Sequence, residues 1–233
     1  MNRLERASYD DGAIALTGWV ARPPGAVRAA VAVFPTIMNM TAAIETKAQA
    51  LAEAGYLAFI ADFYGQQPAD FAAASLLADR LRGDTDAYRA RLRAALGAMQ
   101  DLAPDAPRAA IGFCMGGQAV LELARDDADV LLVASFHGLL ETGRRADRPI
   151  RSRILVCHGD ADALVPRDHV LRFWEEMDAV GANWHFHSYS GVPHGFTNPN
   201  PSPANGVVFY DASADRQSWA AFSELLDEVL PRT

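Results

Sequence analysis

The sequence predicts an α/β fold: a mostly parallel, doubly wound sheet flanked by helices. Short apolar segments rich in β-branched and aromatic residues alternate with longer amphipathic segments of helical period. That alternation is the pattern of parallel strands joined by helices. The chain has 233 residues, of which 50% are hydrophobic and 21% charged, a balance that excludes disordered and fibrous chains. We therefore expect residues 1–233 to form a single domain.

The first predicted elements are a hairpin, a buried strand and a helix. Ile14–Val20 alternates in polarity and is expected to pair with Leu4–Ser8. Arg28–Phe34 is a short apolar segment that stops at a proline, which is typical of a buried strand. Thr41–Ala54 has helical spacing of its apolar residues and is followed by Gly55, a common helix stop signal.

The remaining elements repeat the alternation of buried strand and amphipathic helix. Strands are predicted over Tyr56–Ala61, Arg108–Phe113, Val130–Phe136, Arg153–His158 and Asn183–Tyr189. Helices are predicted over Phe71–Leu81, Asp86–Leu102, Met115–Arg125, Arg167–Val180 and Ala214–Leu230. The stretch Thr197–Gly206, rich in Pro, Asn and Gly, is expected to be a surface loop. Ligands of doubly wound sheets bind at the carboxyl ends of the parallel strands, so site residues should directly follow these strands.

Composition excludes several kinds of partner. Lys and Arg number 21 against 29 Asp and Glu, a net charge of −8. Nucleic-acid binding needs clustered positive charge, so no nucleic-acid partner is expected. No stretch approaches the about 18 apolar residues of a membrane span, so no membrane partner is expected either.

The expected location is the cytoplasm. Cys114 and Cys157 are too few for a disulfide framework, and the N-terminal residues lack the pattern of a secretory signal peptide. No phosphate-binding glycine loop or dinucleotide fingerprint is present, so no cofactor is expected. His185 and His187 share one strand face, but no third ligand is apparent, so we expect solvated side chains and no metal.

The strongest motif lies between a predicted strand and a predicted helix. Residues 112–117 read Gly-Phe-Cys-Met-Gly-Gly, the nucleophile-elbow pattern with cysteine in place of the commoner serine. Strand and helix cross closely at such a turn and leave no room for a side chain, so Gly112 and Gly116 fit the two positions. The Cys114 thiol would then project at the helix N-terminus, where the dipole favours a thiolate. The alternative is a tight turn around a small buried cysteine, and the strand–turn–helix context favours the nucleophile.

A nucleophile of this kind needs a base and a group that orients the base. In this class of fold the chain order is nucleophile, acid, histidine. Asp162 falls in the loop after the strand Arg153–His158, with Asp160 two residues earlier as a turn-forming neighbour. His194 follows the next strand in a Gly/Pro loop. We expect Asp162, and not Asp160, to orient His194.

With these motifs the chain resembles the dienelactone hydrolase family, α/β-hydrolases without a large lid domain. The resemblance covers roughly residue 28 to the end. It rests on residues 112–117, on Gly-Asp-Ala-Asp-Ala-Leu-Val-Pro at 159–166 and on Gly-Val-Pro-His-Gly-Phe-Thr-Asn-Pro at 191–199. Asp-Phe-Tyr at 62–64 and the ending Tyr210-Asp211-Ala212, Asp215-Arg216 and Ser218-Trp219 also fit. It implies an α/β-hydrolase fold and the triad Cys114, Asp162 and His194.

The resemblance also implies the surroundings of the triad. Backbone N–H groups of Met115 and Ile37 would form the oxyanion hole. Side chains near the triad would contact a small-molecule ester or lactone: Thr36, Tyr64, His137 and Phe196. For His137, an equally good interpretation is a histidine at a strand end whose ring hydrogen-bonds the backbone and does not contact substrate. No cofactor or metal is implied, and we expect a monomer or a small homo-oligomer.

Two departures from the family pattern concern activation and substrate. Thr36 stands where the family usually carries a glutamate beside the resting thiol, so activation would rest on His194 alone. Asn198 stands where dienelactone-specific members carry an arginine for a substrate carboxylate. The expected function is therefore hydrolysis of a small ester or lactone through an acyl-thioester. The alternative is a weakened hydrolase fold that binds a ligand or senses thiol oxidation.

Overall fold

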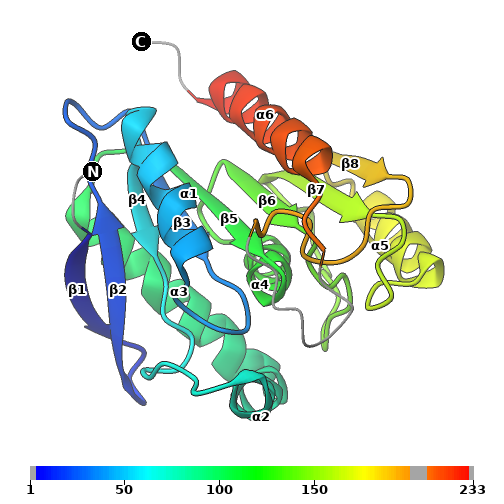
Figure 1. The fold of residues 1–233 in the computed structure, drawn as a ribbon, viewed down its shortest axis with the longest axis horizontal. Coiled ribbons are helices and arrows are strands. Elements are labelled where there is room, and N and C mark those ends of the chain that lie inside the picture. The colour runs from blue at the N-terminus through cyan, green and yellow to red at the C-terminus, as the bar shows by residue number, and fades with distance from the viewer. Residues whose placement is uncertain (1–3, 200–208, 231–233) are drawn as a thin grey trace.

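The computed structural model describes residues 4–199 and 209–230 of the chain (Figure 1). Part of the expected loop Thr197–Gly206 falls outside these residues. The described strands are β1 Glu5–Asp10, β2 Ala15–Ala21, β3 Ala30–Phe34, β4 Leu57–Ile60, β5 Arg108–Phe113, β6 Leu132–Phe136, β7 Arg153–Gly159 and β8 Trp184–Tyr189. The helices are α1 Ala42–Glu53, α2 Phe71–Arg82, α3 Thr85–Leu102, α4 Met115–Arg125, α5 Arg167–Ala179 and α6 Ala212–Val229.

The strands form one eight-stranded sheet in the order β1-β2-β4-β3-β5-β6-β7-β8. The hairpin β1–β2 is antiparallel and joins the sheet antiparallel to β4, whereas β4, β3, β5, β6, β7 and β8 run parallel to their neighbours. This arrangement confirms the predicted doubly wound, mostly parallel sheet. Its parallel part brings the carboxyl ends of six adjacent strands, from β4 to β8, to one edge.

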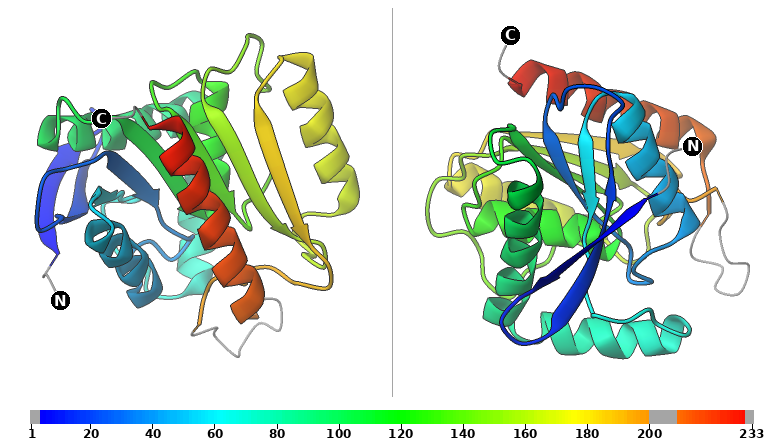
Figure 2. Two further views of the ribbon diagram at one scale, coloured as in Figure 1. Left: turned by 90° about the horizontal axis from the view of Figure 1, so that it is seen from above. Right: turned by 90° about the vertical axis from the view of Figure 1, so that its left-hand side faces the viewer.

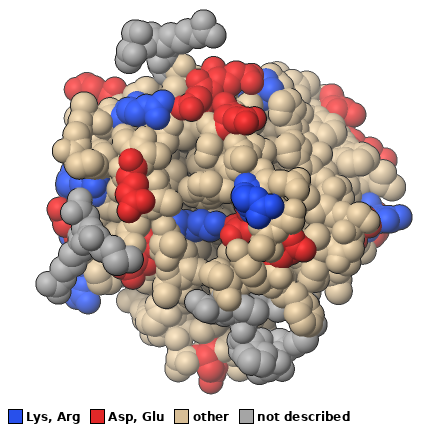
Figure 3. Space-filling model, turned by 45° about the horizontal axis from the view of Figure 1, so that its top comes forward, with Lys and Arg blue, Asp and Glu red and all other residues tan. Residues whose placement is uncertain are grey.

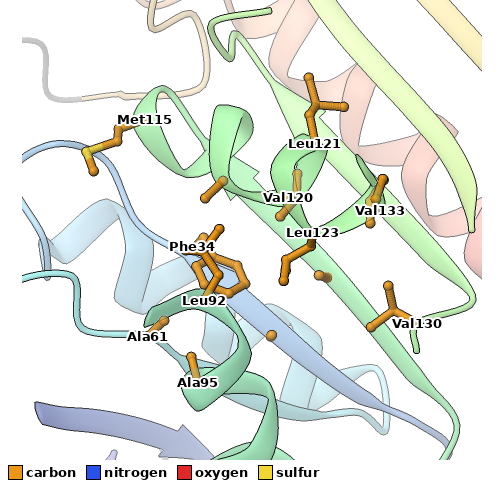
Figure 4. Packing of buried hydrophobic residues seen from close by; sticks show 14 of the residues in the cluster. Phe34, Ala61, Leu92, Ala95, Met115, Val120, Leu121, Leu123, Val130 and Val133 are labelled. Carbon is orange, nitrogen blue, oxygen red and sulfur yellow. The ribbon is translucent and has the colours of Figure 1, made fainter. Parts of the chain in front are cut away.

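Helices cover both faces of the sheet (Figure 2). One core contains alternate residues of β3 such as Ala32 and Phe34, with apolar residues of α3, α4 and α5. The other contains Val31 and Val33 with residues of α1 and α6. Side chains of a strand point to opposite faces in turn, so a strand buried on both faces reads as a continuous apolar segment. Figure 4 shows Phe34 among residues of α3 and α4.

The predicted elements agree with the structure to within a few residues at each end, and the differences have local causes. Helix α6 begins at Ala212, before the predicted start, because the Asp211 side chain accepts a hydrogen bond from the Ala214 N–H at 2.8 Å and caps the helix. Asp84 caps α3 in the same way directly after Gly83, which separates α2 from α3.

The charge of the surface and the polarity of the helices relate to the expectations about nucleic-acid and membrane partners. On the face drawn in Figure 3, acidic and basic side chains are interspersed among uncharged ones. Within residues 4–199 and 209–230, each helix is too short or too polar to cross a bilayer.

Candidate active site

The nucleophile turn, residues 112–117, joins β5 to α4. Cys114 has φ 56° and ψ −116°, a left-handed conformation that is strained for a residue with a side chain. Its N–H donates to the Phe136 carbonyl at 3.0 Å, which ties the turn to the end of β6. Because α4 begins at Met115, the half-buried thiol lies at the helix N-terminus.

Close backbone packing forces this turn. A Cβ on Gly112 would lie 1.8 Å from the Gly116 carbonyl oxygen. A Cβ on Gly116 would lie 2.0 Å from the Phe34 carbonyl oxygen and 2.4 Å from that of Pro35. Both neighbours are backbone atoms that cannot move aside, so the two glycines are required where the predicted motif has them.

The loops after β7 and β8 bring an acid and a base together. Gly159 ends β7, and a Cβ there would lie 2.2 Å from the Val192 carbonyl oxygen, so the His194 loop packs directly on that strand end. His194 Nδ1 lies 2.8 Å from Asp162 Oδ2, and both side chains are buried. Asp160 points elsewhere, toward Arg167 at 2.8 Å. Of the two candidate acids, Asp162 therefore contacts the histidine.

His194 also hydrogen-bonds Cys114, and the two groups alter each other's pKa. Burial alone would lower the pKa of His194, but the Cys114 thiolate and the bond to Asp162 raise it to about 10. Burial alone would raise the pKa of the Cys114 thiol, but the positive charge and hydrogen bond of His194 lower it. Each shift favours the charged form of its group, a thiolate beside an imidazolium.

Two backbone N–H groups face the same sulfur. Those of Met115, in the first turn of α4, and Ile37, in the loop after β3, hydrogen-bond the Cys114 sulfur and further lower its pKa. Donors from the residue after the nucleophile and from the loop after β3 are the pair that forms the oxyanion hole in α/β-hydrolases. The two predicted donors thus lie side by side at the thiol.

The oxyanion loop, residues 36–40, is held by side chains from distant segments. The Asn39 amide donates to Asp62 Oδ1 at 2.8 Å, and its oxygen accepts the Phe63 N–H at 3.1 Å. The Tyr64 hydroxyl donates to the Ile37 carbonyl at 3.1 Å. Asn39 itself has φ 60°, a conformation that asparagine tolerates better than most residues. These bonds fix the direction of the Ile37 N–H.

The remaining predicted residues differ in how far substrate could reach them. Thr36 is half-buried, and its hydroxyl accepts the Met38 N–H at 3.2 Å, so it shapes the oxyanion loop. Tyr64 is 8% exposed and its hydroxyl also lies 3.2 Å from Met115 Sδ. Phe196 is fully buried and packs edge-on against His137. Tyr64 and Phe196 therefore have internal contacts that support the site from behind.

His137 follows β6 and is 2% exposed, so it too has an internal place in this structure. Its Nδ1 accepts the Cys114 N–H at 3.2 Å, and its Nε2 lies 2.8 Å from Thr197 Oγ1. The ring packs edge-on against His194 with centroids 5.1 Å apart. Burial, together with the charge of His194, holds the pKa of His137 well below its usual range.

Arg82 is a cation on the Tyr64 side of the site. Arg82, in the last turn of α2, is near enough to Tyr64 and Tyr88 to act on the pKa of both phenols. Its guanidinium donates to the Ala78 carbonyl and to Asp79. Arg80, the other arginine near the end of α2, is exposed. Arg82 is thus the better placed of the two to meet a bound anion.

No metal centre is apparent in the described part of the chain, since no group of three or more His, Cys, Asp or Glu residues is placed to hold an ion. Of the two strand histidines, His185 has an internal partner: its Nε2 lies 2.9 Å from the Arg153 guanidinium.

Sequence reasoning missed Asn39 as part of the site. Its contribution depends on Asp62, which follows β4 and is 23 residues further along the chain. The available signal was an asparagine in the loop after one strand and an aspartate after the neighbouring strand. Such a pair becomes informative only once the order of strands in the sheet is known.

Comparison with known proteins gives a family match over most of the chain. The model of the dienelactone hydrolase family matches residues 16–230. A solved structure described as a dienelactone hydrolase-like promiscuous phosphotriesterase from metagenomic libraries superposes with a TM-score of 0.92, at 32% identity over 98% of this chain and 99% of that one.

Two curated relatives have names that describe a reaction. A probable 2-oxo-3-(5-oxofuran-2-ylidene)propanoate lactonase of Bradyrhizobium is 30% identical over 76% of this chain and 77% of its own length. Carboxymethylenebutenolidase 2 of Cupriavidus pinatubonensis is 37% identical over 40% of this chain and 43% of its own length. An uncharacterised protein of Caenorhabditis elegans is 38% identical over 60% of this chain and 92% of its own.

Proposed function

The chain belongs to the dienelactone hydrolase family, and we propose that it hydrolyses small esters or lactones, with Cys114 as nucleophile, His194 as acid and base, and Asp162 as the group that orients His194. The observation that carries the proposal is the arrangement around one sulfur: His194 and the N–H groups of Met115 and Ile37 all hydrogen-bond Cys114. Nucleophile, proton carrier and oxyanion donors are the parts that acyl transfer needs.

In the proposed first half-reaction the Cys114 thiolate attacks the carbonyl carbon. Electrons of the C=O bond move to oxygen, and the Met115 and Ile37 N–H groups stabilise this oxyanion. The C–O bond to the leaving group then breaks, and the His194 imidazolium gives its proton to the leaving alcohol. The product is an acyl-thioester on Cys114 with neutral His194 beside it.

The second half-reaction uses the loss of the thiolate charge. The raised pKa of His194 owes more to the Cys114 charge than to Asp162. Once the sulfur is acylated, its negative charge is gone and the pKa of His194 falls. The ring therefore stays neutral after it has given its proton to the leaving alcohol. Neutral His194 can then take a proton from water as the water attacks the thioester carbon. The C–S bond breaks next, which releases the carboxylic acid and restores the Cys114 thiolate beside the His194 imidazolium. Asp162 holds the ring in position through both steps.

A substrate with a negatively charged group would suit Arg82. Asn198 stands where dienelactone-specific relatives have an arginine, and Arg82 approaches the site from α2 instead. A carboxylate on the acyl or leaving group would replace the half-exposed ion pair of Arg82 with Asp79 by one with the substrate. This favours ester or lactone substrates that carry a carboxylate over uncharged ones of equal size.

The test is a panel of p-nitrophenyl esters and small lactones, with and without a carboxylate, against the wild type and Cys114→Ala. Turnover by the wild type, and its loss in the variant, supports the proposal; full activity in Cys114→Ala contradicts it. An aryl phosphotriester belongs in the panel because the structural relative at 32% identity is described as a promiscuous phosphotriesterase.

The second candidate function, a ligand-binding or thiol-sensing protein, is favoured by one feature, Thr36 in place of the family glutamate. The ester panel, together with alkylation of Cys114, distinguishes a hydrolase from such a protein. A hydrolase turns over at least one activated ester, whereas a sensor shows rapid alkylation or oxidation of Cys114 with no turnover of any ester in the panel.

A further inference from the structure

A second histidine, His137, contacts both the backbone of the nucleophile and the ring of the base and has no step in the mechanism above. We propose that His137 is a positioning residue, held as the neutral tautomer with its proton on Nε2, that ties the nucleophile turn to the His194 loop through Thr197. Its effect on turnover rests on the proposed function; its effect on the thiol does not.

The tautomer follows from the partners of the ring. The Cys114 N–H, which is shared with the Phe136 carbonyl at 3.0 Å, points at His137 Nδ1, 3.2 Å away, and a second N–H there would oppose it, so Nδ1 presents its lone pair. The ring proton then sits on Nε2, and the Thr197 hydroxyl oxygen, 2.8 Å away, accepts it. Both polar ends of a 2% exposed ring are thereby satisfied.

The charged groups around His137 oppose a second proton. The His194 ring packs edge-on against it, and Lys47 of α1 acts on it electrostatically. Cys114 lies on its Nδ1 side, and the rings of Phe113 and Phe196 pack against it. Protonating Nδ1 would break the bond from Cys114 and put two imidazolium ions in contact. The site therefore holds one transferable imidazole proton, that of His194.

The bridge joins two parts of the site that are distant in the sequence. On one side, His137 contacts the N–H of the nucleophile; on the other it contacts Thr197, three residues after His194. The His137 N–H donates to the Cys157 carbonyl of β7 at 2.8 Å, which anchors the ring between the strand ends. If the bridge sets the relative position of Cys114 and His194, its loss should weaken their ion pair.

The first test compares Thr197→Val with Thr197→Ser. Valine keeps the shape of threonine but has no acceptor for His137 Nε2, whereas serine keeps the hydroxyl. We expect Thr197→Val to lower kcat about tenfold with KM little changed, and to raise the pH midpoint of Cys114 alkylation by iodoacetamide. Thr197→Ser should restore both values toward those of the wild type.

The second test is a double-mutant cycle with His137→Asn. Asparagine tolerates the φ of 42° at this position, and its side-chain oxygen can accept the Cys114 N–H in place of Nδ1. It cannot reach Thr197, so His137→Asn/Thr197→Val should be no worse in kcat than His137→Asn alone. Long-range ¹H–¹⁵N spectra of the wild type should show His137 as the neutral Nε2–H tautomer while His194 is an imidazolium.

The outcomes distinguish this proposal from the proposed function. If Thr197→Val loses only thermal stability, with kcat and the alkylation midpoint unchanged, His137 is structural and the proposal is wrong. An imidazolium signal for His137 at neutral pH also overturns it. If the wild type hydrolyses no ester but Thr197→Val still shifts the alkylation midpoint, the proposed function fails and the positioning role stands.

Discussion

The nucleophile turn and the oxyanion loop supply the two halves of the candidate site and are built by different means. Residues 112–117 are fixed by contacts between backbone atoms, because glycines at 112 and 116 leave no room for a Cβ. Residues 36–40 are fixed by side-chain hydrogen bonds from the segment after β4, chiefly Asn39 with Asp62 and Tyr64 with Ile37. The first region is rigid by sterics, and the second depends on a few polar groups.

This difference predicts how each region responds to change. A side chain added to the nucleophile turn meets backbone atoms that cannot move aside, so we expect the folded protein to be strongly destabilised. A polar group removed from the oxyanion loop leaves the core intact, so the cost should appear mainly in catalysis. The following variants test that division, from the largest expected effect to the smallest.

Gly116→Ala should have the largest effect. Its Cβ would lie 2.0 Å from the Phe34 carbonyl oxygen, so either β3 or α4 must shift. We expect little folded protein, measured by thermal denaturation and yield. Gly97→Ala in α3 is the matched control, because a Cβ there meets nothing within 4 Å and alanine favours helix. A Gly116→Ala protein as stable as Gly97→Ala would refute the steric account.

Asp162→Asn should lower kcat by roughly 10³- to 10⁴-fold while the protein stays folded. The change removes the charge that holds His194 Nδ1 and favours the wrong tautomer. Asp160→Asn is the control, since Asp160 pairs with Arg167 at the surface and should change kcat little. The assignment fails if Asp160→Asn is the more damaging at equal folded fraction.

Asn39→Ala should lower kcat by about 10- to 100-fold, less than Asp162→Asn, because it loosens one of two oxyanion donors without removing it. Both the bond to Asp62 Oδ1 and the bond from the Phe63 N–H are lost. KM should change little, since the Ile37 N–H acts on the transition state. Steady-state kinetics on an activated ester measures this; a change confined to KM would mean that the loop binds substrate instead.

Tyr64→Phe should have the smallest effect, a few-fold decrease in kcat. It removes the bond from the hydroxyl to the Ile37 carbonyl and the contact of the hydroxyl with Met115 Sδ, while the ring stays packed against Phe63. Combined with Asn39→Ala, it should be less than additive, because both act on the same loop. Full additivity would show that the two contacts position different groups.

The same division explains what the sequence could predict. The nucleophile turn is a local motif: Gly112 and Gly116 flank Cys114 in the chain, and the flanking strand and helix are strongly apolar or amphipathic. The loops of Asp162 and His194 follow predicted strands in the expected order. The order of strands in the sheet is not a local property: it places β4 between β2 and β3, and with it the contacts of Asp62 with both the N-terminal hairpin and Asn39.

His137 shows the limit of position alone. Its place after a strand fitted a substrate contact and an internal residue equally well. The choice depended on Thr197, 60 residues away, and on the burial of the ring. Likewise, Arg82 could be preferred over Arg80 only after the rotation of α2 turned one inward and the other to solvent.

The most direct test of the central claim is the pH dependence of Cys114 alkylation by iodoacetamide, followed by mass spectrometry in the wild type and in His194→Ala. The account predicts labelling at Cys114 with a midpoint below the about 8.5 of an ordinary thiol, because thiolate persists above its lowered pKa. Cys157 should react slowly, since burial raises its pKa to about 12. In His194→Ala the midpoint should rise by a unit or more, roughly a tenfold loss of thiolate at neutral pH. An unchanged midpoint in His194→Ala, or equal labelling of Cys157, would contradict the thiolate–imidazolium pair.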